Sequence, residues 1–211
     1  MRRTGEALRH VCWLGGSACA GKTAVARLLS ERRGSALYSC DDHFEEHRKR
    51  ASPERHPRFY HLMDLPVERL WSQPAEEQAR DLLGFYADEF EMVLEDLAAM
   101  SGPVLAEGVG LLPDLLAAIP VDPRRAVWLL SSEAFRLRAY PQRGSYVEEM
   151  LSRYDDPERT FREWMRRDSL VADFIADGAR RMGGTILSIE GSRSVEQMAE
   201  ALIERFSLKE S

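Results

Sequence analysis

Two patterns of apolar residues run along the chain, and together they predict strands that alternate with helices. Five short runs are nearly continuous in apolar or β-branched residues, as buried parallel strands are; they cover residues 10–15, 35–40, 104–108, 125–130 and 185–189. Segments with an apolar residue at every third or fourth position, the spacing of amphipathic helices, cover residues 23–33, 75–100, 158–182 and 195–206. This alternation predicts an α/β fold in which helices cover both faces of a parallel sheet.

Glycine, proline and polar residues separate these segments. Gly34 follows the first predicted helix and suits its C-terminal cap. Residues 43–61 are polar and basic and contain two prolines, so we predict a loop or short irregular helices there. No internal repeat or low-complexity linker divides the chain, and we therefore predict a single domain over residues 1–211.

Composition excludes several classes of protein. The chain is 44% hydrophobic and 30% charged, as ordinary globular proteins are, and its net charge of −6 argues against nucleic-acid or membrane binding by bulk electrostatics. No apolar run approaches the roughly 20 residues that span a bilayer, and no secretory signal is visible. Cys12, Cys19 and Cys40 are odd in number and lack CxxC spacing. We therefore expect a reduced, cytoplasmic protein without a disulfide framework or a zinc site.

Residues 16–23 carry the most specific motif of the chain. They match G-x-x-x-x-G-K-[ST] and lie between a predicted strand and a predicted helix, which is the context of a phosphate-binding P-loop. Glycines let the backbone curl so that its N–H groups point at phosphate oxygens, and the helix that follows adds its positive end. Lys22 is expected to reach the β- and γ-phosphates, and Thr23 to place a hydroxyl on Mg²⁺. The alternative is a chance glycine-rich turn. The predicted nucleotide-binding residues of the loop are Gly16, Ser17, Ala18, Cys19, Ala20, Gly21, Lys22 and Thr23.

The segments around the loop indicate which kind of P-loop protein this is. No Asn-Lys-x-Asp segment of the kind that reads guanine is present, and the third strand ends in Leu-Ala-Glu-Gly without the Asp-Glu pair of AAA-type ATPases. Residues 39–44, Ser-Cys-Asp-Asp-His-Phe, follow the second strand directly. With the P-loop, these features resemble the P-loop small-molecule kinases: the nucleoside, shikimate, gluconate and chloramphenicol kinases and the kinase half of polynucleotide kinase. The resemblance implies a three-layer αβα sandwich with a five-stranded parallel sheet of order 2-3-1-4-5 and a helical lid.

The same resemblance implies two acidic site residues. Asp41 lies where these kinases have the general base that faces the acceptor hydroxyl; the alternative is that Asp41 or Asp42 caps the following helix or turn. Glu107, before Gly108 at the end of the third strand, is expected to hold Mg²⁺ through water or to contact the acceptor. An ordinary acid at a strand end is the alternative.

Arginines after the fourth strand resemble the lid arginines of shikimate-type kinases. The resemblance implies that Arg136 lies near the adenine and that Arg143 reaches the phosphates as a catalytic residue. Arg193 lies in a glycine-containing loop before the last helix, which resembles the adenine-contacting loop of adenylate-kinase-like proteins. For each arginine, a solvated position on the surface is the alternative.

A basic segment follows Asp41. Residues 43–61 contain four of the five histidines and five basic side chains, Arg48, Lys49, Arg50, Arg55 and Arg58. We hypothesise that this segment recognises a phosphate or carboxylate on the acceptor, or a nucleic-acid 5′ end. A solvated basic loop is the alternative. The acceptor-binding region is expected to span residues 43–100, and the lid residues 132–168.

The predicted function is that of an ATP-dependent kinase. It would transfer the γ-phosphoryl group of ATP, with Mg²⁺, to a hydroxyl of a small molecule, with Asp41 as general base. Two alternatives remain: a nucleotide-binding regulatory or interaction protein without kinase activity, and a toxin-type kinase that acts on a sugar nucleotide. The sequence names neither the acceptor nor the oligomeric state.

Overall fold

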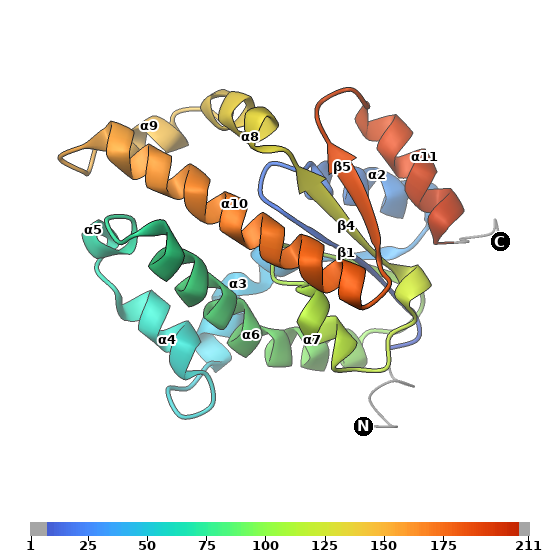
Figure 1. Cartoon of the computed structure of the whole chain (residues 1–211). Coiled ribbons are helices and arrows are strands. Elements are labelled where there is room, and N and C mark those ends of the chain that lie inside the picture. Colours follow the sequence, from blue (N-terminus) through green and yellow to red (C-terminus); the bar gives the residue numbers. More distant parts are fainter. Residues whose placement is uncertain (1–7, 207–211) are drawn as a thin grey trace.

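A central parallel sheet organises the computed structural model, which describes residues 8–206 (Figure 1). Its strands are β1 (Val11–Gly16), β2 (Ala36–Ser39), β3 (Val104–Glu107), β4 (Ala126–Ser131) and β5 (Thr185–Ile189). All pairings are parallel and the order is β2-β3-β1-β4-β5. The predicted five-stranded parallel sheet of order 2-3-1-4-5 is therefore confirmed.

The register of the strands brings polar residues to one edge of the sheet. Ser39 is paired with Glu107 at the ends of β2 and β3, and Gly16 at the end of β1 is paired with Leu129 on β4. Since the carboxyl ends of parallel strands share one edge, the segments that follow these strands lie close together. Residues far apart in the sequence thus meet at this edge.

Helices cover both faces of the sheet and bury the alternating strand side chains (Figure 1). On one face lie α2 (Lys22–Arg33) and α11 (Val195–Arg205), packed on a core that includes Leu14 and Val127. On the other face lie α6 (Ala75–Ala99), α7 (Pro113–Ala117) and α10 (Pro157–Arg181), packed on a core that includes Trp13 and Trp128. Neighbouring residues of each strand point to opposite faces, which explains why the strands read as continuous apolar runs.

The long helices end close to their predicted positions. The first ends at Gly34, which adopts the left-handed conformation of a C-terminal cap, as predicted. The remaining short elements connect the layers: α3 (Cys40–Arg50), α4 (Pro57–Asp64), α5 (Val67–Leu70), η1 (Pro123–Arg125), α8 (Glu133–Ala139), η2 (Tyr140–Gln142) and α9 (Tyr146–Leu151). Among the helices of residues 8–206, none has both the length and the apolar character needed to cross a membrane.

The prediction of a loop or short irregular helices over residues 43–61 is wrong for residues 43–50. Residues 40–50 form a regular helix, α3, and Pro57 begins the shorter α4. The charges of α3 suit a helix, because acids occupy its first turn and basic residues its last turn. Its buried side is formed partly by a histidine, His47, so the apolar pattern that identifies an amphipathic helix is weak here.

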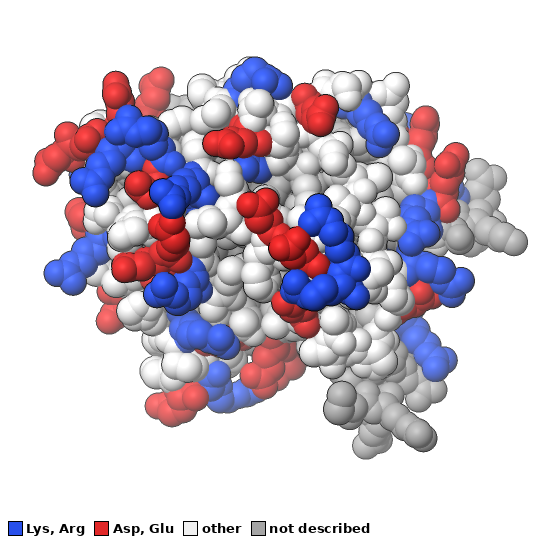
Figure 2. Space-filling view, viewed as in Figure 1, with Lys and Arg blue, Asp and Glu red and all other residues white. Residues whose placement is uncertain are grey.

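The basic segment is also not a free positive patch. Arg50, Arg55 and Arg58 each form ion pairs with acids of α6, which neutralise them. Arg58 holds Asp88, a buried carboxylate that also accepts from the backbone N–H of Arg58 and Phe59 at the start of α4. Positive and negative side chains likewise lie beside one another on the face shown in Figure 2. The hypothesis that these arginines recognise an anionic acceptor or a nucleic-acid end therefore does not fit the structure.

The close approach of β1 and β4 gives a first prediction, for Gly16→Ala. Gly16 has a φ of +134°, and a Cβ at this position would lie 2.0 Å from the carbonyl oxygen of Leu129. We expect the substitution to lower the free energy of unfolding by about 3 kcal/mol or more, since strain and a backbone clash add. The urea midpoint of unfolding measures this loss.

Gly34→Ala is the matched control. Gly34 has a φ of +62°, but no atom lies within 4 Å of the position of its Cβ. Gly34→Ala therefore introduces an unfavourable left-handed conformation but no clash, and we expect it to lower the free energy of unfolding by about 1–2 kcal/mol. Equal losses in the two variants would contradict the assigned contact between Gly16 and Leu129.

Candidate functional site

A pocket of about 360 Å³ opens at the carboxyl edge of the sheet. It is lined by the glycine-rich loop and the start of α2, by residues at and just after the end of β3, by the start of α3, and by α8 and the segment after η2. The lining residues are Ala18, Cys19, Ala20, Gly21, Lys22, Thr23, Ala24, Asp41, Glu107, Val109, Phe135, Ala139 and Arg143. Most of the residues that the sequence singled out thus meet in one place.

The backbone of the loop is shaped to receive an anion. Gly16 and Gly21 have positive φ angles, and Cys19, with a φ of 58°, is the one non-glycine residue within 8–206 that does. Gly21 precedes α2, and neither a side-chain cap nor an acid occupies the first turn of that helix. In contrast, α8, α10 and α11 are capped by Ser or Asp side chains. The N–H groups at the start of α2 therefore remain available for a phosphate.

A buried hydroxyl pair holds the loop against β4. The Oγ atoms of Ser17 and Ser131 lie 2.9 Å apart, and the backbone N–H of Ser131 donates to Ser17 Oγ at 2.9 Å. Ser131 Oγ in turn donates to the carbonyl of Ala18 at 2.7 Å. These bonds fix the loop before any ligand binds, so little ordering is required on binding.

Lys22 lies beneath the loop with 8% of its surface exposed. Its Nζ donates to the carbonyl oxygen of Ser17 at 2.9 Å. Burial lowers the pKa of Lys22, while the negative charges of Glu107 and Asp41 oppose this effect. The ammonium group is therefore placed between the loop and two carboxylates, where an added phosphate would improve its charge balance.

Thr23 and Glu107 form the second polar pair of the pocket. Thr23 Oγ1 donates to Glu107 Oε1 at 3.0 Å, and Ser39 Oγ donates to the same oxygen at 2.9 Å. Glu107 is 2% exposed. Within residues 8–206 no group of three His, Cys, Asp or Glu side chains could hold a metal ion. A hydroxyl and one carboxylate are nevertheless a donor set that fits Mg²⁺, which takes its other ligands from water and phosphates.

Asp41 lines the pocket from the first turn of α3. Its carboxylate is exposed, and its charge is close enough to act on the buried Lys22. The end of β2 sets this position, because α3 begins directly after Ser39. The side chain predicted as a base thus shares a pocket with the loop, while its role remains a prediction.

Arg143 lies beside the glycine-rich loop. It is exposed, its Nη1 lies 3.9 Å from Cys19 Sγ, and its guanidinium lies 5.8 Å from the centre of the Tyr140 ring. It follows η2, in the short elements after β4. Of the arginines predicted for the site, this one lines the pocket.

Arg136 lies elsewhere, behind the loop. It is 2% exposed and donates to the carbonyl of Ser131 and to Ser169 Oγ, the second at 2.7 Å. The predicted contact with adenine does not fit this buried position. Through Ser131, Arg136 instead braces the hydroxyl pair that holds the loop.

Arg193 is exposed in the loop between β5 and α11 and does not line the pocket. The loop itself is close, because a Cβ on Gly191 would lie 2.9 Å from the ring of Phe135, which lines the pocket. The predicted backbone contact with a nucleotide base thus fits this loop better than a contact from the Arg193 side chain.

Three residues of the site were not predicted as site residues from the sequence: Ser39, Ser131 and Phe135. Ser39 was part of the quoted segment, but only its pairing with β3 reveals its bond to Glu107. Ser131 is the last residue of β4, and Phe135 lies in α8, which follows β4 at the same edge of the sheet. Their position at the end of a parallel strand, or in the helix that follows it, is the signal that could have identified them.

No protein-family model matches the chain, and no curated protein sequence gives a significant match. Among solved structures, the chain is similar to shikimate kinase from Acinetobacter baumannii in complex with shikimate. The identity is 18%, the TM-score is 0.47, and 95% of each chain is covered. At this identity and TM-score, neither an activity nor a substrate follows for this chain.

Proposed function

We propose that this protein is an ATP-dependent kinase that phosphorylates a hydroxyl of a small molecule. One observation carries the proposal: Asp41 lines the same pocket as the glycine-rich loop, Lys22 and Glu107. The loop accounts for phosphate binding, and the carboxylate beside it accounts for transfer to a hydroxyl rather than binding alone.

Each residue has a task in binding the nucleotide. The backbone N–H groups of residues 16–23 bind the phosphates, and Lys22 and Arg143 balance the charge that spreads over the transferring group. Thr23 and Glu107 would hold Mg²⁺, which would neutralise negative charge on the phosphates of the nucleotide. The loop between β5 and α11 borders the base.

Asp41 orients the acceptor and takes its proton. As the acceptor oxygen forms a bond to the γ-phosphorus, the bond from phosphorus to the β-phosphate oxygen breaks and its electron pair leaves with ADP. The proton of the acceptor hydroxyl passes to the Asp41 carboxylate, which stands at the exposed rim where a small molecule can enter.

The regions on either side of the pocket divide the remaining work within a single domain. Residues 43–100 form the acceptor side, and residues 132–168, with Arg143, form a lid that excludes water during transfer. Arg50, Arg55 and Arg58 pair with acids of α6, so the basic character of residues 43–61 gives no reason to expect an anionic acceptor.

A screen for ADP release tests the proposal. The full chain is incubated with Mg·ATP and with hydroxylated metabolites, nucleosides and antibiotics in turn. Stimulated ADP release together with a phosphorylated product, detected by mass spectrometry, supports a kinase. ATP binding without stimulation by any compound would favour the nucleotide-binding regulatory protein instead.

Glu107→Gln tests the assignment of the magnesium site. The amide keeps an oxygen that accepts from Thr23 and Ser39 but removes the charge, so we expect the Mg²⁺ concentration for half-maximal ADP release to rise by roughly 10–100-fold. A Mg²⁺ titration at saturating ATP measures this change.

Ser39→Ala is the matched control, because it removes one hydrogen bond to Glu107 and keeps the carboxylate. It should shift the Mg²⁺ requirement much less. An unchanged requirement in Glu107→Gln would show that this carboxylate does not serve the metal.

A further inference from the structure

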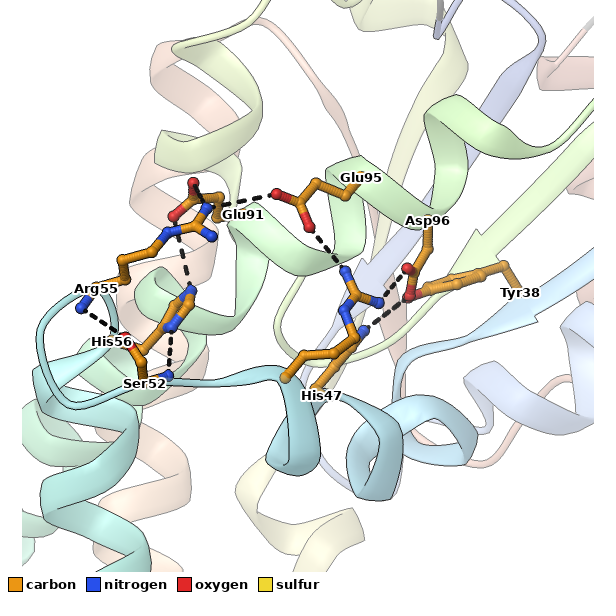
Figure 3. A network of polar contacts seen from close by, with 9 residues as sticks. Tyr38, His47, Ser52, Arg55, His56, Glu91, Glu95 and Asp96 are labelled. Carbon is orange, nitrogen blue, oxygen red and sulfur yellow. Dashed lines mark hydrogen bonds and ion pairs between the residues drawn. The ribbon is translucent and has the colours of Figure 1, made fainter.

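His47 makes two buried contacts with carboxylates that have no part in the proposed reaction. It lies on α3, is completely buried at 0% exposed, and faces one carboxylate at each ring nitrogen. Its Nδ1 is 2.9 Å from Glu89 Oε1, and its Nε2 is 2.9 Å from Asp96 Oδ2. Figure 3 shows the second of these contacts, with Tyr38 beside it. The histidine thus joins α3 to two points on α6.

These contacts determine how many protons the imidazole ring of His47 carries. An ionised carboxylate only accepts hydrogen bonds, and a neutral imidazole has a single N–H to donate. The Tyr38 hydroxyl, 3.2 Å from Nε2, donates its own proton to Asp96 at 2.9 Å. Both contacts of His47 are therefore made only by the imidazolium. Its charge and that of Arg50, which pairs with Asp96, balance Glu89 and Asp96.

The electrostatics agree with this count. Burial alone would lower the pKa of His47, but the hydrogen bonds and charges of Glu89 and Asp96 outweigh burial and raise it. Burial would raise the pKa of Asp96, but hydrogen bonds from His47, Arg50 and Tyr38 outweigh it and lower that pKa. The titratable and charged groups that face His47 or its partners, from β2, α3 and α6, are Tyr38, Cys40, His43, Arg50, Glu89, Glu95 and Asp96.

The position of His47 on α3 links it to the pocket. Asp41 lies six residues earlier on the same helix, about 9 Å along its axis. Most of α3 is exposed; besides His47, it is held on its inner side by Cys40 near Gly108 and by Phe44, whose ring centre is 6.0 Å from that of Phe59. A short helix with few buried side chains depends on each of them for its placement.

We propose that His47 is a positioning residue: as an imidazolium held between Glu89 and Asp96, it fixes α3 against α6 and so keeps Asp41 at the phosphate pocket. This inference rests on the proposed kinase function. When His47 loses its proton, one carboxylate faces a ring nitrogen without hydrogen, and α3 loses one of its attachments to α6.

The direction of the pH dependence is fixed by this arrangement. A histidine whose pKa is raised on folding contributes stability that is complete below its unfolded pKa of about 6.5 and is lost as the pH rises through its folded pKa. We therefore expect phosphoryl transfer to decline by roughly tenfold or more in total as the pH rises through the folded pKa of His47. ATP affinity should stay constant over the same range, because the glycine-rich loop does not depend on α3.

The protonation state is measured first, without any activity. Long-range ¹H–¹⁵N NMR spectra of the full chain report whether each ring nitrogen of His47 carries a proton. At pH 7 both nitrogens should be protonated, and the transition should lie above that of an ordinary histidine. A neutral ring at pH 7 overturns the proposal.

Glu89→Gln then tests the link to Asp41. The new amide can donate to Nδ1 while the N–H of a neutral ring donates to Asp96, so a neutral His47 fits this variant. The alkaline decline of ADP release should therefore disappear. His47→Gln should release ADP at least tenfold more slowly near neutral pH. His56→Gln is the matched control, since His56 is another buried histidine near an α6 acid, Glu91, but outside α3. It should keep the wild-type pH profile.

The outcomes separate this inference from the proposed function. If the wild-type chain transfers no phosphoryl group at any pH, the kinase proposal fails, and with it the link from His47 to Asp41. If transfer occurs and Glu89→Gln keeps the wild-type alkaline decline, the positioning role of His47 fails while the kinase proposal stands.

Discussion

Asp41→Asn is expected to abolish phosphoryl transfer while leaving ATP binding intact. The amide has nearly the shape of the carboxylate but cannot take the proton of the acceptor hydroxyl, and a positioned general base contributes about 10²–10⁴-fold to a rate. Asp41 is an exposed residue on the first turn of α3, so the substitution leaves the core and the glycine-rich loop unchanged. The expected loss therefore falls on the rate of transfer and not on folding or on nucleotide affinity.

Two measurements on the same preparation check this result. Single-turnover transfer from radiolabelled ATP gives the rate of the chemical step, and calorimetry gives the dissociation constant of ATP. Asp42→Asn is the control, because Asp42 is the adjacent exposed acid on the same turn. Equal effects of the two substitutions, or full transfer by Asp41→Asn, would rule out Asp41 as the base.

Lys22→Ala is expected to damage both transfer and nucleotide binding. Lys22 is buried beneath the loop, where its ammonium group donates to the Ser17 carbonyl and lies near the charges of Glu107 and Asp41. Its removal takes away the cation nearest to the loop and leaves Glu107 without that charge. Because this electrostatic contribution acts in a desolvated site, we expect the rate to fall by about 10²–10³-fold, with weaker ATP binding.

The same two assays measure this effect, with Lys49→Ala as the control. Lys49 is exposed on α3 and pairs with Glu46 on the same helix, so its loss should leave ATP affinity unchanged. A Lys22→Ala variant that binds ATP as tightly as the wild type and transfers at the same rate would contradict the assignment of the phosphate site.

The two substitutions together separate the functional alternatives. A kinase requires both side chains for transfer and only Lys22 for nucleotide binding. A nucleotide-binding regulatory protein would respond to Lys22→Ala and would be indifferent to Asp41→Asn. The pair therefore decides between the classes before the acceptor is known.

Much of the fold was predictable because its signals are local. The strands follow from apolar runs of four to six residues, and the long helices from apolar patterns over eleven to twenty-five residues. Gly34 marks a helix end through its own conformational freedom. The glycine-rich loop is equally local, because eight consecutive residues supply its glycines, its lysine and its hydroxyl. The strand order was correct because it came with the resemblance that this loop and its neighbouring segments indicated.

The arrangement of partners around the loop was decided by tertiary structure. The sequence shows Arg50 and Arg55 as part of a basic segment, while their partners, Asp96 and Glu91, lie 46 and 36 residues away on α6. Arg136 is likewise an ordinary helical arginine in the sequence, and only the packing of α8 against α10 buries it behind the loop. Charge pairing depends on distance in space, which local patterns do not encode.

His47 shows the same limit most clearly. In the sequence it is one of four histidines in a polar segment, with nothing to distinguish it. In the structure α6 brings one carboxylate to each of its ring nitrogens, from 42 and 49 residues away. The sequence by itself determined the glycine-rich loop and the individual strands that support it, since both follow from neighbouring residues. The acidic partners of His47, Arg50 and Arg55 were decided only by the packing of α3 and the segment after it against α6, because these partners lie 36 to 49 residues away in the sequence.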